Sequence, residues 1–233
     1  MSDAIAAVAL GRRPYGEALL LQRRLCRARI DGALDHDVLL LVEHPPVVTL
    51  GRGTQQSSLP LPPALLEQRG LEVFEVERGG DVTLHAPGQL VGYPILHLEH
   101  HRTDLHWYLR TVETALIDAV GALGVAAERQ AGLTGVWTGG RKIASIGVHV
   151  KRWVTLHGFA LNVTTDLSLF DLIVPCGIAG VRMTSVAAES GRDDRETLWS
   201  ETEDATVRSF GTAFDRPMRR DPAASLDQAL AAC

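Results

Sequence analysis

Apolar and polar residues follow two different periods along this chain, and the two periods predict strands and helices. Short runs rich in Val, Ile and Leu, each bounded by Gly, Pro or charged residues, are typical of strands. They occur at residues 4–10, 38–43, 47–50, 71–77, 93–98, 142–150 and 153–163. Thr83-Leu-His85 also alternates as a strand does, so Thr83 and His85 are expected to face the same side.

Three other segments repeat their apolar residues at steps of three and four, the period of a helix. They are residues 15–30, 105–123 and about 196–214. The second should bury one face, made of Leu105, Leu109, Val112, Leu116 and Val120. Either Thr103 or Asp104 could cap its first turn.

The order of these elements predicts the fold class. Residues 142–163 hold two strands separated by a short polar link, which indicates an antiparallel hairpin. Because strands follow strands and helices do not alternate with them regularly, we expect an α+β fold with a mixed, largely antiparallel sheet and packed helices. Residues 1–215 should form a single domain, and 216–233 a C-terminal tail that is either docked or mobile.

Composition narrows the class of protein. The formal net charge is −5 and the basic residues are scattered, which disfavours nonspecific nucleic-acid binding. Three widely spaced cysteines form no disulfide framework, no apolar run is long enough to span a membrane, and the first residues do not resemble a signal peptide. We therefore expect a cytoplasmic protein without a membrane partner.

Residues 78–93, Arg-Gly-Gly-Asp-Val-Thr-Leu-His-Ala-Pro-Gly-Gln-Leu-Val-Gly-Tyr, are the most informative stretch. Paired glycines let the backbone approach a ligand closely, and polar side chains lie directly before and after them. Residues 139–147 combine glycines with Lys142, one of two lysines in a chain that otherwise uses Arg. Gly147 and Gly158 could form a slot for an extended ligand in the hairpin, although a β-bulge would explain them too.

Cys176 lies in a turn between Pro175 and Gly177. Such a turn holds a thiol away from packed layers and leaves backbone N–H groups for an oxyanion, as a nucleophile requires. A buried structural cysteine is the commoner role for a lone Cys, but Cys26, which lies on a helix among leucines, fits that role better.

Lys142 begins a strand face that is otherwise apolar, together with Ala144 and Ile146. A lysine there either points into a cleft, where it could activate the thiol, or reaches solvent from an edge. His85 is a competing partner for the thiol or a hydrogen-bonded core residue. His97 and His101 have a spacing that metal sites use, but a solvated loop without a metal is the better interpretation.

Four segments resemble the lipoyl(octanoyl) transferase family in their order and spacing. They are residues 78–93, 140–147, 157–163 and 175–180, within a resemblance that covers about residues 15–197. Leu84 and Ala86 depart from the residues common in that family. These departures affect the expected width of the pocket and not the expected chemistry. The resemblance implies a fold like that of the biotin and lipoate protein ligases.

The resemblance also implies an activity and residue roles. Cys176 would carry an acyl thioester, with Lys142 as its acid/base partner. The acyl pocket would be lined by Arg78, Gly79, Gly80, Asp81, Val82, Thr83, Leu84, His85, Gln89, Tyr93, Ser145, Ile146, Gly147, His157, Gly158, Phe159 and Ala160. An octanoyl group would pass from an acyl carrier protein to a lysine on the lipoyl domains of 2-oxoacid dehydrogenase complexes or on the glycine cleavage H protein. No cofactor is implied, because one thioester is exchanged for another without ATP.

Three alternatives stay open from the sequence. An ATP-dependent lipoate or biotin ligase would need no thiol, and a non-catalytic lipoyl- or acyl-binding protein would need neither Cys176 nor Lys142. A Cys–His thioesterase would depend on His85 and tolerate the loss of Lys142.

Overall fold

A computed structural model describes residues 4–177 and 180–231, apart from the side chains of Cys176 and Gln228. A seven-stranded sheet dominates it, in the order β10-β1-β2-β6-β9-β8-β7. Its strands are β1 (Ile5–Arg12), β2 (Asp37–Glu43), β6 (Gln89–Ile95), β7 (Val136–Thr138), β8 (Arg141–Lys151), β9 (Val154–Asn162) and β10 (Met218–Arg220). Pairing is parallel from β10 to β2 and antiparallel from β2 to β7. The expected α+β class with a mixed, largely antiparallel sheet is confirmed.

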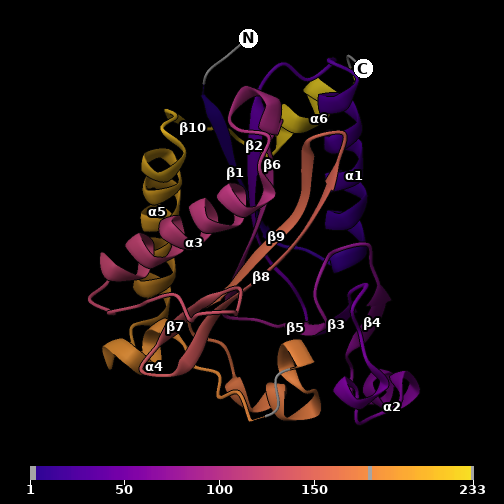
Figure 1. The fold of residues 1–233 in the computed structure, drawn as a ribbon, viewed down its shortest axis with the longest axis vertical. Coiled ribbons are helices and arrows are strands. Elements are labelled where there is room, and N and C mark those ends of the chain that lie inside the picture. The colour runs from indigo at the N-terminus through magenta and orange to yellow at the C-terminus, as the bar shows by residue number, and fades with distance from the viewer. Residues whose placement is uncertain (1–3, 178–179, 232–233) are drawn as a thin grey trace.

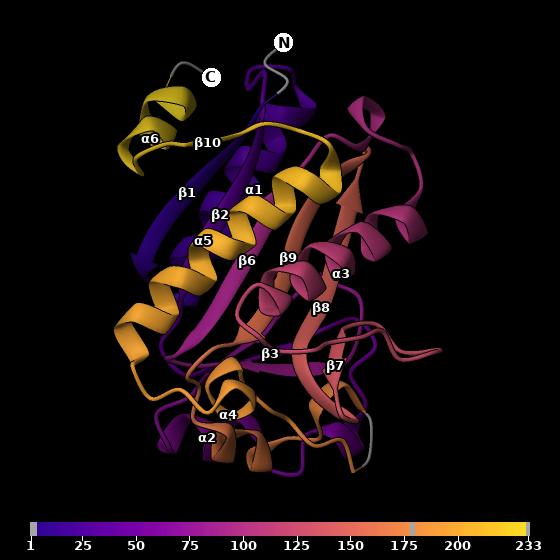
Figure 2. The same cartoon turned by 90° about the vertical axis from the view of Figure 1, so that its left-hand side faces the viewer.

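Helices cover both faces of this sheet (Figure 1). Two of them, α3 (Leu105–Gly121) and α5 (Arg195–Phe214), lie side by side across one face, as Figure 2 shows, and α1 (Tyr15–Ile30) runs along the other. A hydrophobic core lies on each face of the sheet, and strand β2 contributes to both because its side chains alternate. Leu39 and Leu41 pack on the α3–α5 side, whereas Leu40 packs on the α1 side.

A second sheet of three strands lies at one end of the molecule, in the order β4-β3-β5. Its strands are β3 (Val47–Leu50), β4 (Glu72–Glu75) and β5 (Val82–His85). The same end holds η1 (Gln56–Ser58), α2 (Pro63–Gln68), η3 (Leu167–Leu172), η4 (Pro175–Gly177) and α4 (Val186–Ser190). The sequence indicates these strands but not their separate sheet, because each has only four residues and its partners are distant in the chain.

The helices and the hairpin agree with the sequence. Asp104 is the residue that caps α3, since its side chain accepts a hydrogen bond from Trp107 N at 3.0 Å. Leu105, which is 43% exposed, and Leu109, which is only partly buried, do not belong to the buried face of that helix, contrary to the expectation from the sequence. Strands β8 and β9 pair from Ala144↔Leu161 to Lys151↔Val154, and the turn between them holds two residues at positive φ.

Residues 216–231 pack against the elements described above. Strand β10 extends the sheet beside β1, and α6 (Ala224–Ala231) places Leu226 in the core under α1. A further short helix, η2 (Leu98–His100), follows β6. Within the described ranges, no helix combines the length and the apolar character that crossing a membrane requires.

Candidate active site

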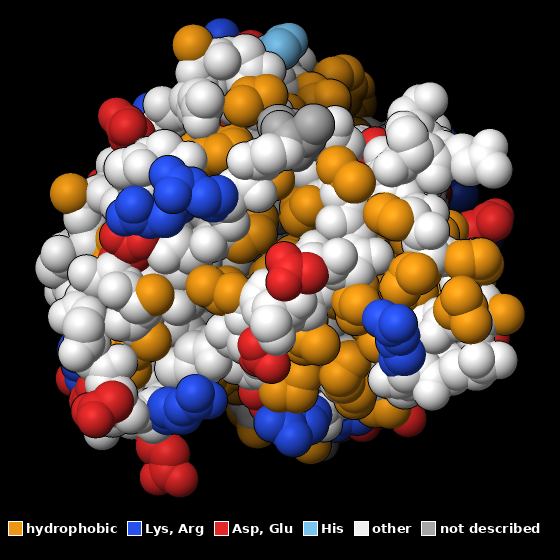
Figure 3. Space-filling model, turned by 90° about the horizontal axis from the view of Figure 1, so that it is seen from below, with side chains coloured by type: hydrophobic (Ala, Val, Ile, Leu, Met, Phe, Trp, Pro, Cys, Tyr) orange, Lys and Arg blue, Asp and Glu red, His pale blue; other side chains and the backbone are white. Residues whose placement is uncertain are grey.

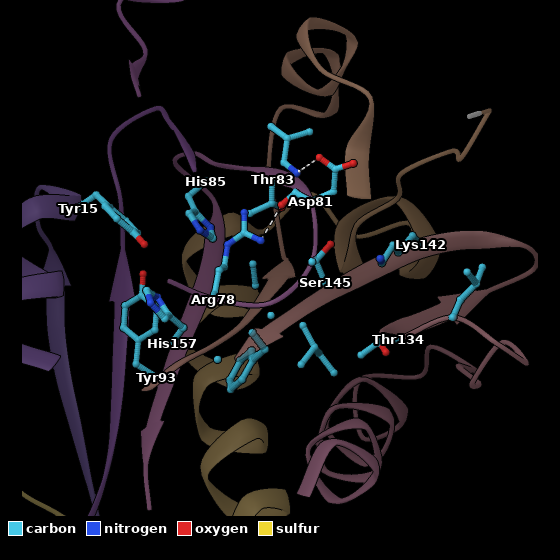
Figure 4. A pocket seen from close by; sticks show the side chains of 18 of the residues that line it. Tyr15, Arg78, Asp81, Thr83, His85, Tyr93, Thr134, Lys142, Ser145 and His157 are labelled. Atoms are coloured by element: carbon cyan, nitrogen blue, oxygen red, sulfur yellow. Dashed lines mark hydrogen bonds between the residues drawn. The ribbon is translucent and has the colours of Figure 1, made fainter. Parts of the chain in front are cut away.

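A cavity of about 220 Å³ lies between β5, β8, β9 and the loop of residues 129–135. A single water needs only about 10–15 Å³, so the space suits a larger ligand. Figure 4 shows Lys142, Ser145 and Thr134 at one end of it, and Tyr15, Tyr93 and His157 at the other.

Most of the residues expected at an acyl pocket do line this cavity. They are Arg78, Gly80, Asp81, Val82, Thr83, His85, Tyr93, Ser145, Ile146, Gly147, His157, Gly158, Phe159 and Ala160, together with Lys142. Four lining residues were not expected, namely Tyr15, Gly132, Leu133 and Thr134. They come from the start of α1 and from an irregular loop, and no local motif marks them.

Three expected residues lie outside the lining. Leu84 packs into the core under the small sheet, because strand alternation turns it away from Thr83 and His85. Gln89 stands behind His85, to which it is hydrogen-bonded. Gly79 instead ties the glycine loop to the hairpin, since its N–H donates to Val148 O at 2.8 Å.

Arg78 organises the loop that precedes β5. Its Nη2 donates to Thr49 O at 2.6 Å, and its Nη1 donates to Asp81 O at 2.7 Å. Only 6% of the residue is exposed. A buried guanidinium that donates to backbone carbonyls fixes the chain on both sides of it, so this arginine shapes the pocket through Gly79 and Gly80.

The tautomer of His85 follows from a chain of amides. Asn162 Nδ2 donates to Thr184 O at 2.9 Å, so Asn162 Oδ1 must be the acceptor for Gln89 Nε2, also at 2.9 Å. Gln89 Oε1 therefore accepts from His85 Nδ1 at 2.8 Å. His85 is left with Nε2 as a hydrogen-bond acceptor. Burial lowers the pKa of His85 to about 3, so the imidazole is neutral at pH 7.

His44 and Tyr93 form a second buried pair, of which Tyr93 lines the pocket. His44 Nδ1 lies 2.8 Å from Arg13 O, an acceptor, so this nitrogen carries the proton. Nε2 therefore accepts from the Tyr93 hydroxyl at 2.8 Å. Burial lowers the pKa of His44 to about 4, in keeping with a neutral ring. This end of the pocket is therefore lined by aromatic rings, and the histidine behind them carries no charge at pH 7.

His157 breaks the regular geometry of β9. Its φ is +59°, and its N–H donates to Gln22 Oε1 at 3.1 Å instead of to a neighbouring strand. Pro94, in the adjacent strand β6, has no N–H to offer, and its carbonyl accepts from the Thr155 hydroxyl at 2.6 Å. The regular pairing of β9 with β6 ends at Phe159↔Gly92, before Pro94 is reached, and four consecutive residues, His157 to Ala160, line one cavity.

Lys142 is buried in the pocket, with 1% of the residue exposed, which excludes an edge lysine in solvent. Its Nζ lies 5.4 Å from the centroid of the Trp137 ring, in a cation–π arrangement. The pairing of β7 with β8 shifts by one residue next to Lys142, and Ile143 and Ala144 both join the apolar core. The regular pleat expected from the sequence is therefore interrupted at Lys142.

The backbone of Lys142 is bonded to the segment that follows the Cys176 turn. Its N–H donates to Arg182 O at 2.8 Å, and its carbonyl accepts from Thr184 N at 2.9 Å. Cys176 itself falls in η4, and its side chain lies outside the described part of the structure. The geometry therefore ties the cysteine segment to the lysine without locating the thiol.

Among the histidines after β6, His101 takes part in a buried cluster of polar side chains that supports the fold. His101 Nε2 lies 2.7 Å from Asp37 Oδ2, and Arg29 Nε donates to the other oxygen of Asp37 at 2.8 Å. Among the residues that the structure describes, no three His, Cys, Asp or Glu side chains are placed to hold a metal.

Comparison with known proteins places this fold and pocket in a class. The sequence pattern of the lipoyl protein ligase A/B catalytic domain matches residues 14–211, and the chain belongs to this family. It is similar to the octanoyltransferase of Solibacter usitatus, 50% identical over 218 residues that cover 93% of this chain and 95% of that one. It is also 55% identical to the octanoyltransferase of Gloeobacter violaceus over 168 residues, 72% and 73% of the two chains. The family predicted from the four motifs is confirmed.

Solved structures agree on the fold. A bipartite lipoate protein ligase from Thermoplasma acidophilum superposes with a TM-score of 0.75 over 98% of this chain and 91% of that one, at 18% identity. A lipoate-protein ligase A bound with ATP superposes with a TM-score of 0.74 over 99% of this chain and 93% of that one, at 16% identity. The expected likeness to the lipoate ligase fold is confirmed.

Proposed function

We propose that this protein is a cytoplasmic octanoyltransferase, which moves an octanoyl group from an acyl carrier protein to a lysine on a lipoyl domain. Relatives of that name align with most of the chain at 50–55% identity. One structural observation carries the proposal. Lys142 is buried at one end of a largely apolar pocket, and its backbone is bonded to the segment that leaves the Cys176 turn.

The reaction runs in two steps through Cys176. Lys142 takes the thiol proton, and the thiolate attacks the carbonyl carbon of the carrier thioester. A new C–S bond forms, the old one breaks, and the carrier thiolate takes the proton back from Lys142. The acceptor amine then attacks the Cys176 thioester, Lys142 takes a proton from that amine, and Cys176 leaves as a thiolate.

The pocket suits the acyl chain through its backbone and rings. Glycines at 147 and 158 let the facing strands approach, and Phe159 offers an apolar surface between the two ends. Because His85 and His157 have pKa values lowered to about 3 and about 4 by burial, neither places a charge beside the chain at pH 7. Burying apolar CH₂ groups here stabilises the complex by about 0.8 kcal/mol each.

The partners follow from the reaction. We propose an acyl carrier protein as donor, and the lipoyl domains of 2-oxoacid dehydrogenase complexes and the glycine cleavage H protein as acceptors. Figure 3 views the end of the molecule that carries the small sheet, and it shows both basic and acidic groups among hydrophobic side chains. The basic groups among them suit the docking of an acidic carrier.

Intact-mass spectrometry after mixing the protein with octanoyl-carrier thioester, without ATP, tests the proposal. We expect an octanoyl adduct on Cys176 that is absent in Cys176→Ala and is discharged by a lipoyl domain. Modification of the acceptor only when free octanoate and ATP are supplied would show a ligase instead. Hydrolysis of the thioester that survives Lys142→Ala would show a thioesterase.

A further inference from the structure

We propose that Glu113 of α3 is a positioning residue, which fixes the side chain of Lys142 by holding the loop of residues 129–135. The inference rests on the function proposed above, in which Lys142 moves the protons of both steps. Glu113 does not line the pocket, and no sequence motif draws attention to it.

The carboxylate of Glu113 fastens both ends of this loop. Its Oε1 accepts from Gly135 N at 3.1 Å, and its Oε2 accepts from Arg129 Nε at 3.0 Å. Oε2 also accepts from Arg110 Nη1 at 2.7 Å. The Glu113 side chain is 1% exposed, and charge-assisted hydrogen bonds of this kind are among the strongest in proteins.

The base of this loop is closed by a backbone bridge, in which Glu128 N donates to Trp137 O at 2.7 Å and Trp137 N donates to Glu128 O at 2.9 Å. Residues 129–132 and Thr134 are exposed, and Leu133 is half-buried. Gly132, Leu133 and Thr134 nevertheless form one wall of the pocket, at the Lys142 end. A segment with few buried contacts takes its position from its anchors, so the Glu128–Trp137 bridge and Glu113 together set where this wall lies.

Gly135 transmits that position to Lys142. The φ of Gly135 is +132°, and a β-carbon built on it would lie 2.8 Å from Lys142 Cε and 2.7 Å from Ala144 O. The backbone of Gly135 therefore packs directly on the lysine stem, while the Trp137 ring lies near Nζ. A displacement of Gly135 changes the space that the amine occupies, and a shift of about 1 Å in a catalytic group can cost about 10²-fold in rate.

Asp37 provides a matched control. It is also a buried carboxylate, 6% exposed, which accepts from Arg29 at 2.8 Å and lies 2.7 Å from His101 Nε2. Neither it nor these two partners line the pocket. Asp37→Asn therefore reports what the loss of a buried charge pair does to the fold alone.

The experiment compares Glu113→Ala, Glu113→Gln, Arg129→Met, Asp37→Asn and Lys142→Ala in the full chain. One readout is the pH dependence of Cys176 alkylation by iodoacetamide, followed on the Cys176 peptide by mass spectrometry. The other is the single-turnover rate of acylation by octanoyl-carrier thioester and of discharge by a lipoyl domain.

We expect Glu113→Ala to slow both steps by about ten- to a hundredfold, with KM for the acceptor unchanged, and to move the alkylation profile toward that of Lys142→Ala. Glu113→Gln keeps an oxygen for the Gly135 N–H and should recover part of the rate. Arg129→Met, at a side chain that is 39% exposed, removes the contact between Arg129 and Glu113 and should lower both rates by an intermediate factor. Asp37→Asn should keep wild-type rates and the wild-type alkylation profile.

A folded Glu113→Ala protein that matches Asp37→Asn in both readouts would overturn the inference. If Glu113→Ala does not fold, wild-type rates and a wild-type alkylation profile in Arg129→Met would overturn it. Failure of the proposed function can be told apart from failure of this inference. In the first case the wild type would form no octanoyl adduct, and the alkylation profiles would still test the link between Glu113 and Lys142.

Discussion

Gly177 packs against the carboxylate of Asp81 with no room for a side chain between them. A β-carbon on Gly177 would overlap Oδ2 of Asp81. The same oxygen accepts from Ser58 Oγ at 2.6 Å, and Ser58 O accepts from Val174 N at 2.9 Å. Asp81, expected from the sequence as a pocket residue, therefore also holds the turn that carries Cys176.

Gly177→Ala should remove most of the transferase activity. The new methyl group would push η4 away from Asp81, and the φ of +66° is unfavourable for alanine. Gly180→Ala is the control, since Gly180 has a φ of +75° but no atom of the described residues within 4 Å of its β-carbon position. We expect acylation, followed by intact mass, to fall at least tenfold more in the first variant. Equal rates in the two variants would show that the contact with Asp81 does not matter.

Lys142→Ala should lower the rate of acyl transfer by about 10²–10⁴-fold, the usual effect of removing a general acid–base group. His85→Leu should cost much less. An imidazole with a pKa near 3 is too weak a base to take a thiol proton at pH 7. Single-turnover kinetics of both variants decide between the partners. A greater loss in His85→Leu than in Lys142→Ala would favour the Cys–His alternative.

Stability should fall steeply as the pH drops from about 6.5 toward 4. Burial lowers the pKa of His44 and His157 to about 4 and that of His85 to about 3, whereas free histidine titrates near 6.5. In that window the unfolded chain binds protons that the folded chain does not, so acid favours unfolding. Each histidine adds up to about 1.4 kcal/mol per pH unit to the slope.

Urea unfolding across this pH range measures the effect. His44→Gln should flatten the dependence of the unfolding free energy on pH, because one buried titrating group is removed. His106→Gln, at an exposed position, is the control for the substitution itself. An unaltered slope in His44→Gln would contradict the assignment of a neutral, buried ring.

Gly92→Ala should damage both the pocket and the fold. A β-carbon on Gly92 would overlap the ring of Phe159, which lines the cavity. Overpacking of this kind typically costs about 1–3 kcal/mol, and the displaced ring should shift the preference toward shorter acyl chains. Gly121→Ala, at an open position at the end of α3, should instead stabilise the protein by about 0.4–1 kcal/mol. Thermal unfolding and rates with acyl chains of different lengths test both expectations.

The sequence by itself determined the features that depend on neighbouring residues. The period of the apolar residues fixed helix α1 at Tyr15–Ile30, and the two apolar runs joined by a short polar link predicted the β8–β9 hairpin. The glycine motif at 78–93 pointed to a binding pocket because paired glycines with flanking polar groups have few purely structural uses.

Only the tertiary structure decided where the side chains of those motifs go. Lys142 entered the pocket at the place where the register between β7 and β8 shifts. His157 has a left-handed backbone where β9 leaves its regular pairing with β6, the strand that holds Pro94. Glu113 accepts a hydrogen bond from Gly135, 22 residues away in the chain, and Gly135 packs on Lys142. Each of these outcomes depends on a contact between distant residues, and a local pattern of apolar and polar positions does not encode such contacts.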